Sequence, residues 1–243
     1  MKKLSSFTLH VLAMILMLCD HLWATLLPGQ EWLTCIGRIA FPIFAFMVAE
    51  GFYQTSNRKK YLKRMFIFAL ISEIPFNLIM SSGLINPFHQ NVLFTFTLAI
   101  LFMMLIEKIK NIKNNILKYV LIVIVFFASM LIGMLTFVDY YTIGIATVLV
   151  FYLFKEKTWY NLLMQLLLII WLNVSVMGGY GYELNILGYN IFFAQQGFAV
   201  LSLIPIWLYN GKQGYHKKWF KYFCYSFYPC HLLIIYIIWN LLI

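Results

Sequence analysis

Residues 37–52 read GRIAFPIFAFMVAEGF, a stretch apolar enough to cross a bilayer that nevertheless carries Arg38, Pro42 and Glu50. A charged side chain at the centre of a membrane-spanning helix costs roughly 2.5–3.5 kcal/mol on insertion scales. Charges that remain in spans face the protein interior, where they pair or serve a site. The stretch therefore predicts one wall of a buried polar site, and the pair Asp20-His21 before it is expected to supply the chemistry.

The composition is that of a protein with many membrane-spanning segments. Hydrophobic residues make up 63% of the 243 residues and charged residues only 11%, far from the balance of a soluble protein. The four cysteines lack zinc-type spacing and are interpreted as small apolar side chains within spans, so we expect no metal site. We predict an all-α polytopic integral membrane protein with a single domain, residues 1–243.

Hydropathy along the chain predicts about nine transmembrane helices, some of them short. Their approximate ranges are 5–27, 32–54, 66–83, 92–107, 117–135, 141–154, 159–177, 191–209 and 222–242.

The basic residues set the predicted orientation. With the N-terminus in the cytoplasm, the inner segments contain every Lys and Arg except Arg38, and the outer loops contain none. Positively charged loops stay on the cytoplasmic side, so nine spans place the C-terminus outside. The net charge of +10 is then a topology signal and a contact for lipid headgroups, which argues against nucleic acid as a partner.

Helical rise converts sequence position into membrane depth. Asp20 and His21 lie about 6–8 Å outward of the midplane of their span, and Arg38 lies about 7–8 Å outward in the next span. Glu50 falls about 10 Å on the inner side, close to a basic loop. Glu73 and His231 fall near the midplanes of their own spans.

Neighbouring residues on a helix point about 100° apart, so Asp20 and His21 face different directions. We expect Asp20 to pair with Arg38 and His21 to face a cavity. Pro42 has no backbone N–H, which leaves the carbonyl of Arg38 without its helical donor and predicts a kink there.

These groups suit general-base activation of an amine or hydroxyl by a histidine in a poorly hydrated site. Arg38 or the amide of Asn91 is expected to stabilise a developing oxyanion, and the basic inner loop to hold a phosphate-bearing donor. Asp20, His21, Arg38 and Glu73 are equally compatible with a proton-coupled transporter or exporter of a small solute. A third reading is an assembly factor whose polar residues only join helices.

Five stretches in one order resemble the TraX family, named after the protein needed for N-terminal acetylation of the F-type pilin subunit. They are Asp20-His21-Leu22, residues 37–52, residues 61–78 (YLKRMFIFALISEIPFNL), residues 90–95 (QNVLFT) and residues 228–232 (YPCHL). More distantly, the layout is similar to that of transmembrane acyltransferases that carry acetyl from cytosolic acetyl-CoA across the membrane, among them heparan-alpha-glucosaminide N-acetyltransferase.

The resemblance implies a multi-pass acetyltransferase of the cell membrane that takes acetyl-CoA as co-substrate. His21 would be its catalytic residue, supported by Asp20 and Arg38. We assign donor binding to Glu50, Arg58, Lys63, Arg64, Glu73 and Asn91. The expected acceptor is a peptide N-terminus or a cell-surface amine or hydroxyl. We expect the protein to lie in membrane lipid, and a homodimer is one of the oligomeric states that the sequence allows.

Overall fold

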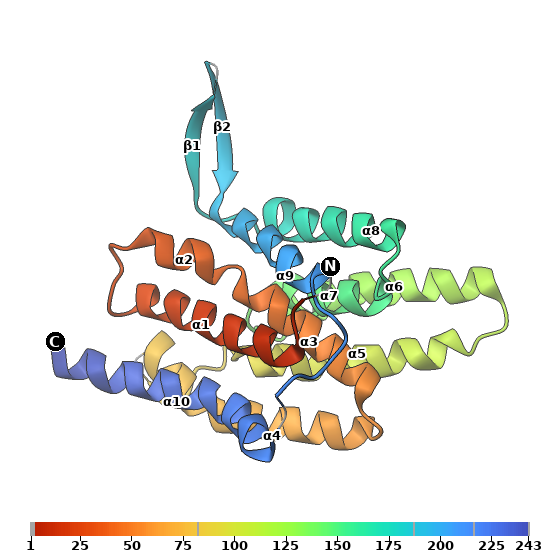
Figure 1. Cartoon of the computed structure of the whole chain (residues 1–243), viewed down its shortest axis with the longest axis horizontal. Helices are drawn as coiled ribbons and strands as arrows, with labels where there is room; N and C mark the ends of the chain where they lie inside the picture. Colours follow the sequence, from red (N-terminus) through yellow and green to blue (C-terminus); the bar gives the residue numbers. More distant parts are fainter. Residues whose placement is uncertain (1–2, 82, 187, 216, 243) are drawn as a thin grey trace. The chain divides into compact units, whose positions relative to one another are not determined.

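The computed structural model describes residues 3–81, 83–186, 188–215 and 217–242, which form helices and one β-hairpin (Figure 1). In chain order the elements are α1 (Ser6–Ala24), α2 (Glu31–Gly37), α3 (Ala40–Gln54), α4 (Arg58–Met80), α5 (Val92–Lys110), α6 (Asn115–Leu135), α7 (Tyr141–Leu153), α8 (Trp159–Ile170), a π-helical turn (Trp171–Met177), β1 (Gly181–Ile186), β2 (Tyr189–Ala194), a 3-10 helix (Gln195–Ser202), α9 (Leu203–Trp207) and α10 (Lys218–Leu242).

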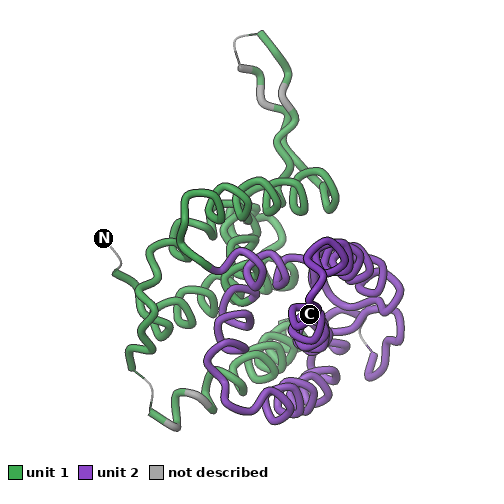
Figure 2. Tube along the Cα trace, turned by 90° about the vertical axis from the view of Figure 1, so that its right-hand side faces the viewer, with its two compact units in different colours: residues 1–44, 156–243 green, residues 45–155 purple. Residues whose placement is uncertain are grey.

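The chain divides into two compact units (Figure 2). Unit 1 contains residues 1–44 and 156–243, and unit 2 contains residues 45–155, so the boundary falls within α3.

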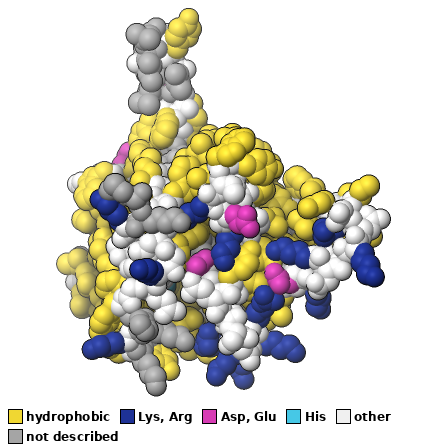
Figure 3. Space-filling model, turned by 45° about the vertical axis from the view of Figure 1, so that its right-hand side comes forward, with side chains coloured by type: hydrophobic (Ala, Val, Ile, Leu, Met, Phe, Trp, Pro, Cys, Tyr) yellow, Lys and Arg dark blue, Asp and Glu magenta, His cyan; other side chains and the backbone are white. Residues whose placement is uncertain are grey.

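Among the described residues, six helices are long and apolar enough to cross a membrane. They are Ser6–Ala24, Glu31–Gln54 (α2 with α3), Val92–Lys110, Asn115–Leu135, Trp159–Met177 and Tyr222–Leu242. Large hydrophobic side chains cover much of the visible surface (Figure 3), as expected of a protein that faces lipid.

Two further predicted spans are helices that fall outside those six. Of the predicted span 66–83, residues 66–80 lie in α4, whose first turns carry a run of basic residues, and residue 82 lies outside the described residues. The predicted span 141–154 is α7, which has 13 residues and a length of about 20 Å at 1.5 Å per residue. Helix α7 is buried from Ile143 to Tyr152 and forms the centre of unit 2, packed against α5 and α6.

The predicted span 191–209 is wrong as a continuous helix. Its first residues form β2, which pairs antiparallel with β1 in a register that runs from Gly181↔Ala194 to Ile186↔Tyr189. The positive φ of Gly188 suits the tight turn of this hairpin. The following run 195–207 is largely 3-10 helix and about 24 Å long, because Gly197 and Pro205 disfavour a long α-helix.

In unit 1, α1 and α10 run parallel. Phe7 contacts Phe220 near the start of both helices, and His21 contacts His231 much further along both. The backbone of residues 3–7 hydrogen-bonds to residues 208–213, so these two basic segments lie together. The parallel course points the ends of α1 and α10 the same way, and the predicted cytoplasmic N-terminus and outer C-terminus stay a prediction.

The helical stretch 31–54 is interrupted at Arg38 and Ile39, between α2 and α3. Pro42 lies four residues after Arg38 and cannot donate to its carbonyl, which is the physical reason for the break. The interruption confirms the predicted kink and leaves Arg38 at the end of α2, where its side chain reaches back to α1.

Candidate active site around His21

The predicted pairing of Asp20 with Arg38 is present in unit 1. Arg38 Nη2 donates to Asp20 Oδ1 at 2.7 Å, and Thr34 Oγ1 donates to the same oxygen at 2.9 Å. Arg38 Nη2 also donates to Thr34 Oγ1 at 2.7 Å. This triad joins α1 to α2 and holds the end of α1 in place. Thr34 is fully buried, and the sequence interpretation did not include it.

A glycine makes this contact between helices possible. A Cβ added at Gly37 would lie 2.5 Å from Asp20 Cβ and 2.7 Å from Asp20 Oδ1. Carbon atoms cannot approach so closely, so any other residue at position 37 would push α1 away from α2. The first residue of the opening stretch thus allows Arg38, the second, to reach Asp20.

His21 contacts His231 of α10. His21 Nδ1 lies 2.7 Å from His231 Nε2, and the two ring planes are 15° from parallel. On the other side of His231, Nδ1 lies 2.7 Å from the carbonyl oxygen of Phe227. His231 is buried and His21 is half-buried. The phenol ring of Tyr228 also lies beside His21, with ring centroids 6.3 Å apart.

The heavy atoms determine which ring nitrogens carry protons. The Phe227 carbonyl only accepts, so His231 Nδ1 is protonated and donates to it. Neutral His231 then has an unprotonated Nε2, which accepts from His21 Nδ1–H. In neutral His21 the lone pair therefore lies on Nε2. The ring orientation of neutral His21 is thus held by a second histidine, with Nε2 as the unprotonated nitrogen.

Sequence reasoning missed this partnership. Depth arithmetic placed His231 near the midplane and His21 about 6–8 Å outward, at different levels. The contact shows that the two residues lie at the same level. The depth estimate failed because α10 is longer than α1, so a position within α10 does not report depth directly. The signal available in the sequence is the segment Tyr228-Pro229-Cys230-His231-Leu232, one of the stretches that resemble the TraX family.

The residues expected to bind the donor at the inner side lie in unit 2, where most have protein partners. Glu50 Oε1 accepts from Gln54 and Glu50 Oε2 lies 3.9 Å from Lys155 Nζ. Arg58 Nη1 pairs with Glu107 Oε2 at 3.0 Å.

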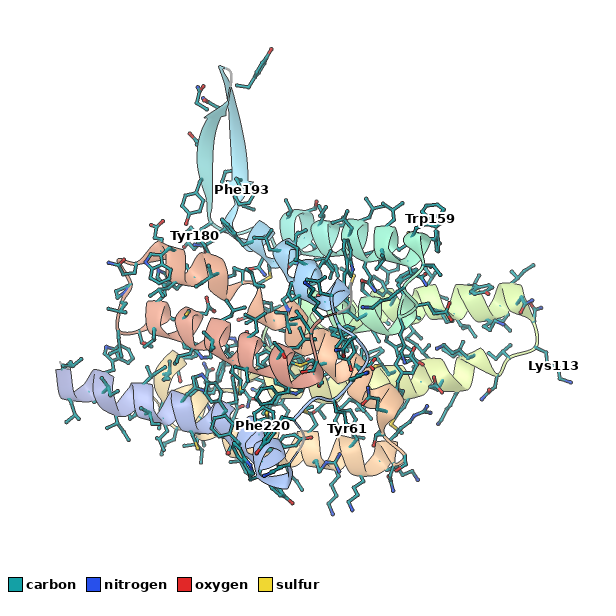
Figure 4. The ribbon with its side chains drawn as sticks, viewed as in Figure 1. Tyr61, Lys113, Trp159, Tyr180, Phe193 and Phe220 are labelled. Atoms are coloured by element: carbon teal, nitrogen blue, oxygen red, sulfur yellow. The ribbon has the colours of Figure 1, made fainter. Side chains whose placement is uncertain are left out.

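Lys63 lines an open cavity of about 590 Å³ between α4 and α5, whose walls are mainly apolar. The guanidinium of Arg64 lies 5.9 Å from the centre of the Tyr61 ring, and its Nε is buried without a hydrogen bond to a described residue. Tyr61 is labelled on α4 in Figure 4. Lys63 and Arg64 both belong to the basic first turns of α4, and their role in donor binding stays a prediction.

Glu73 and Asn91 contact each other in unit 2. Asn91 donates through its backbone N–H and its side-chain amide to Glu73 Oε2. The same amide donates to the carbonyl of Ala69 at 2.9 Å. Both amide hydrogens of Asn91 are therefore used within the protein, so Asn91 would have to break a hydrogen bond before it stabilised an oxyanion. The predicted oxyanion role is better suited to another donor.

The geometry of unit 1 supports one type of chemistry. A half-buried imidazole with a defined basic nitrogen, backed by a second imidazole and a carbonyl, can take a proton from an amine or a hydroxyl. The Asp20–Arg38–Thr34 triad, one residue before His21, fixes the backbone from which that imidazole projects.

Comparison with known proteins identifies the family of the chain. The family described as "TraX protein" matches residues 5–239. A relative from Dichelobacter nodosus, described as "Probable fimbrial assembly protein FimC, serogroup H1", is 37% identical over 113 residues, which are 42% of this chain and 46% of that protein. The match thus spans less than half of the relative's length, and no solved structure matches. On the extent of the family match, the chain belongs to the TraX family.

Proposed function

We propose that the protein is a membrane-embedded acetyltransferase of the cell membrane. It moves an acetyl group from cytosolic acetyl-CoA to an amine at the outer face, and His21 is its general base. Membership of the TraX family supports the proposal, since that family is named after a protein needed for pilin acetylation. A hydroxyl acceptor would use the same base.

The reaction needs one proton to be taken up and returned. His21 Nε2 accepts a proton from the acceptor amine as the amine nitrogen attacks the thioester carbonyl carbon. The C–S bond of acetyl-CoA then breaks, and the thiolate leaves with the proton that His21 held. The new C–N bond makes an amide, and His21 is again neutral.

The observation that carries the proposal is a chain of two hydrogen bonds, from His21 to His231 and from His231 to the carbonyl of Phe227. When His21 Nε2 gains a proton, the positive charge is shared through Nδ1–H with the lone pair of His231 Nε2. The cost of forming an imidazolium in a half-buried place falls accordingly. An isolated histidine on a lipid-facing helix would lack this support.

The acceptor is proposed to be the N-terminal amine of a polypeptide, which places the protein in pilus or fimbrial assembly. The printed description of the Dichelobacter nodosus relative, a probable fimbrial assembly protein, favours this acceptor over a glycan or lipid. The donor is proposed to bind along the basic inner segment of α4 through Arg58, Lys63 and Arg64, near Glu50 in sequence.

The test is acetyl transfer by the purified full-length protein in proteoliposomes, with radiolabelled acetyl-CoA and a peptide that has a free N-terminus. We expect transfer by the wild type and a loss of roughly 10²–10⁴-fold in His21→Ala. The variant should still bind acetyl-CoA. A variant with full activity would refute the assignment of His21. Solute flux without acetyl-CoA, and no stabilisation by it, would instead favour a transporter.

A further inference from the structure

The two carboxylate oxygens of Glu73 in α4 differ: one is held by hydrogen bonds, and the other is buried without one among the described residues. Its Oε2 accepts two hydrogen bonds from Asn91, the residue that caps the start of α5. Its Oε1 is buried and has no hydrogen-bond partner among the described residues. A buried acceptor without a donor costs about 1–3 kcal/mol, and more when it is charged.

Asn77, one helical turn further along α4, is arranged in the same way. Its Nδ2 donates to the carbonyl of Leu84 at 3.2 Å. Asn77 is only 1% exposed, and its Oδ1 is buried without a hydrogen-bond partner among the described residues. Each of the two side chains is thus anchored by one polar atom and offers a second, acceptor atom.

Residues 84–91 fold over this part of α4. Leu84 contacts Asn77, the His89 ring packs against Phe76 with centroids 5.0 Å apart, and Asn91 contacts Glu73. Residues four apart on a helix have Cβ atoms about 5–6 Å apart. One ligand atom covered by this loop can therefore bond to both presented oxygens.

Among the described residues, Glu73 also has no Lys or Arg partner. The ion pairs with Lys or Arg in this part of the chain involve Asp20, Glu50 and Glu107, but not Glu73. The nearby His89 faces Asp139, with Nε2 3.6 Å from Oδ1. A carboxylate in a membrane protein is retained where it has a cationic partner or a function. The missing partner here is a cation that also donates hydrogen bonds.

We propose that Glu73 and Asn77 form a binding site for a primary ammonium group. An ammonium nitrogen carries three N–H donors, which can satisfy Glu73 Oε1 and Asn77 Oδ1 together. A hard metal ion needs six or more oxygen ligands, so with two protein oxygens it would have to keep several waters in a site that residues 84–91 cover. A guanidinium pairs best with both oxygens of a carboxylate, and Asn91 already occupies Glu73 Oε2.

The proposal concerns binding alone and does not rest on acetyl transfer. It assigns Glu73 a ligand of its own instead of a contact with acetyl-CoA or a place in a proton relay. The site lies entirely in unit 2, at the end of α4 that the loop 84–91 covers.

The test is thermal unfolding of the purified full-length protein in detergent with methylammonium chloride as the probe. Tetramethylammonium chloride at the same concentration is the reference, because it carries the same charge without an N–H donor. We expect methylammonium to raise the Tm by several degrees with a saturable dose dependence, since binding to the folded state stabilises it. The reference salt should give no such rise.

Variants separate the site from a general salt effect. Glu73→Gln and Asn77→Ala should each abolish the methylammonium-specific rise, and either suffices if the other fails to fold. Glu50→Gln removes a carboxylate elsewhere in unit 2 and should retain the rise. The proposal is overturned if the wild type responds equally to both salts, or if the rise persists in Glu73→Gln.

Discussion

His21 Nδ1 lies 2.7 Å from His231 Nε2, although the two residues are 210 positions apart in the chain. The Phe227 carbonyl fixes the proton on His231 Nδ1, which fixes the proton on His21 Nδ1 in turn. The base of the proposed reaction is thereby assigned to a single atom, His21 Nε2. His231 is a positioning residue, because it acts through His21.

Replacing His231 by Phe keeps an aromatic ring in the buried space but removes the acceptor for His21 Nδ1–H. We expect acetyl transfer to fall roughly 10–100-fold, because a charge-assisted hydrogen bond of about 1.5–3 kcal/mol is lost from the imidazolium. The measurement is kcat in proteoliposomes across a pH series. The pH at half-maximal rate should also shift, which a purely structural role would not cause.

The matched variant is His231→Gln, whose side-chain oxygen can accept from His21 Nδ1–H. Partial recovery of kcat relative to His231→Phe would agree with the positioning role. Equal kcat in both variants and the wild type would contradict it.

Gly37→Ala should disrupt the Asp20–Arg38 contact, since the added Cβ would lie 2.5 Å from Asp20 Cβ. We expect destabilisation of roughly 1–3 kcal/mol from this overpacking, together with reduced transfer, because α1 carries both Asp20 and His21. Thermal unfolding and the transfer assay measure the two effects. Gly29→Ala is the control, as a Cβ there meets nothing within 4 Å. Equal stability of both variants would contradict the proposed close approach.

Variants of Arg58 and Glu107 can distinguish a role of this ion pair in donor binding from a purely structural role. Arg58 pairs with Glu107 at 3.0 Å, and both side chains are partly exposed. If Arg58 binds a donor phosphate, Arg58→Gln should weaken acetyl-CoA binding roughly 10-fold, the equivalent of about 1.4 kcal/mol. Glu107→Gln removes a competing negative charge, so affinity should not fall. An equal loss of affinity in the two variants, measured by calorimetry, would indicate that the pair is structural.

Tyr182 connects the hairpin to α2. Its hydroxyl lies 3.3 Å from Cys35 Sγ and accepts from Gln195 Nε2 at 3.3 Å. Tyr180 and Phe193 flank this connection at the base of the hairpin (Figure 4). We expect Tyr182→Phe to speed amide hydrogen exchange over residues 181–194 at neutral pH. Unchanged exchange would show that the backbone pairing alone orders the hairpin.

The same contact has a pH dependence. The hydrogen bond with Cys35 raises the pKa of Tyr182 to about 12, above the usual value of about 10 for tyrosine. The folded state then binds more protons than the unfolded state between these pH values. The contribution of Tyr182 to the stability of the folded state is therefore complete below about pH 10 and is lost as pH rises through about 12. The difference in tyrosinate absorbance between wild type and Tyr182→Phe should remain small at pH 10.

Local sequence patterns determined much of the architecture. Hydropathy located the six long apolar helices, because burial in lipid depends on the composition of each segment alone. Pro42 predicted the break at Arg38 because proline has no N–H to donate to the carbonyl four residues earlier. The Asp20–Arg38 pair was also predictable, since the two spans are joined by a short loop and a buried charge requires a partner.

Tertiary structure decided the rest. The run 191–209 is apolar enough for a span, yet pairing with residues 181–186 makes its first part a strand, and hydropathy does not report such pairing. His231 became the partner of His21 only when α10 packed parallel to α1, and the depth of a residue in its own helix cannot specify that contact. By itself the sequence determined a TraX-like membrane protein, and it singled out His21 as the candidate base. The packing of α10 on α1 decided which nitrogen of that histidine is basic, because the proton positions follow from contacts between residues 210 positions apart.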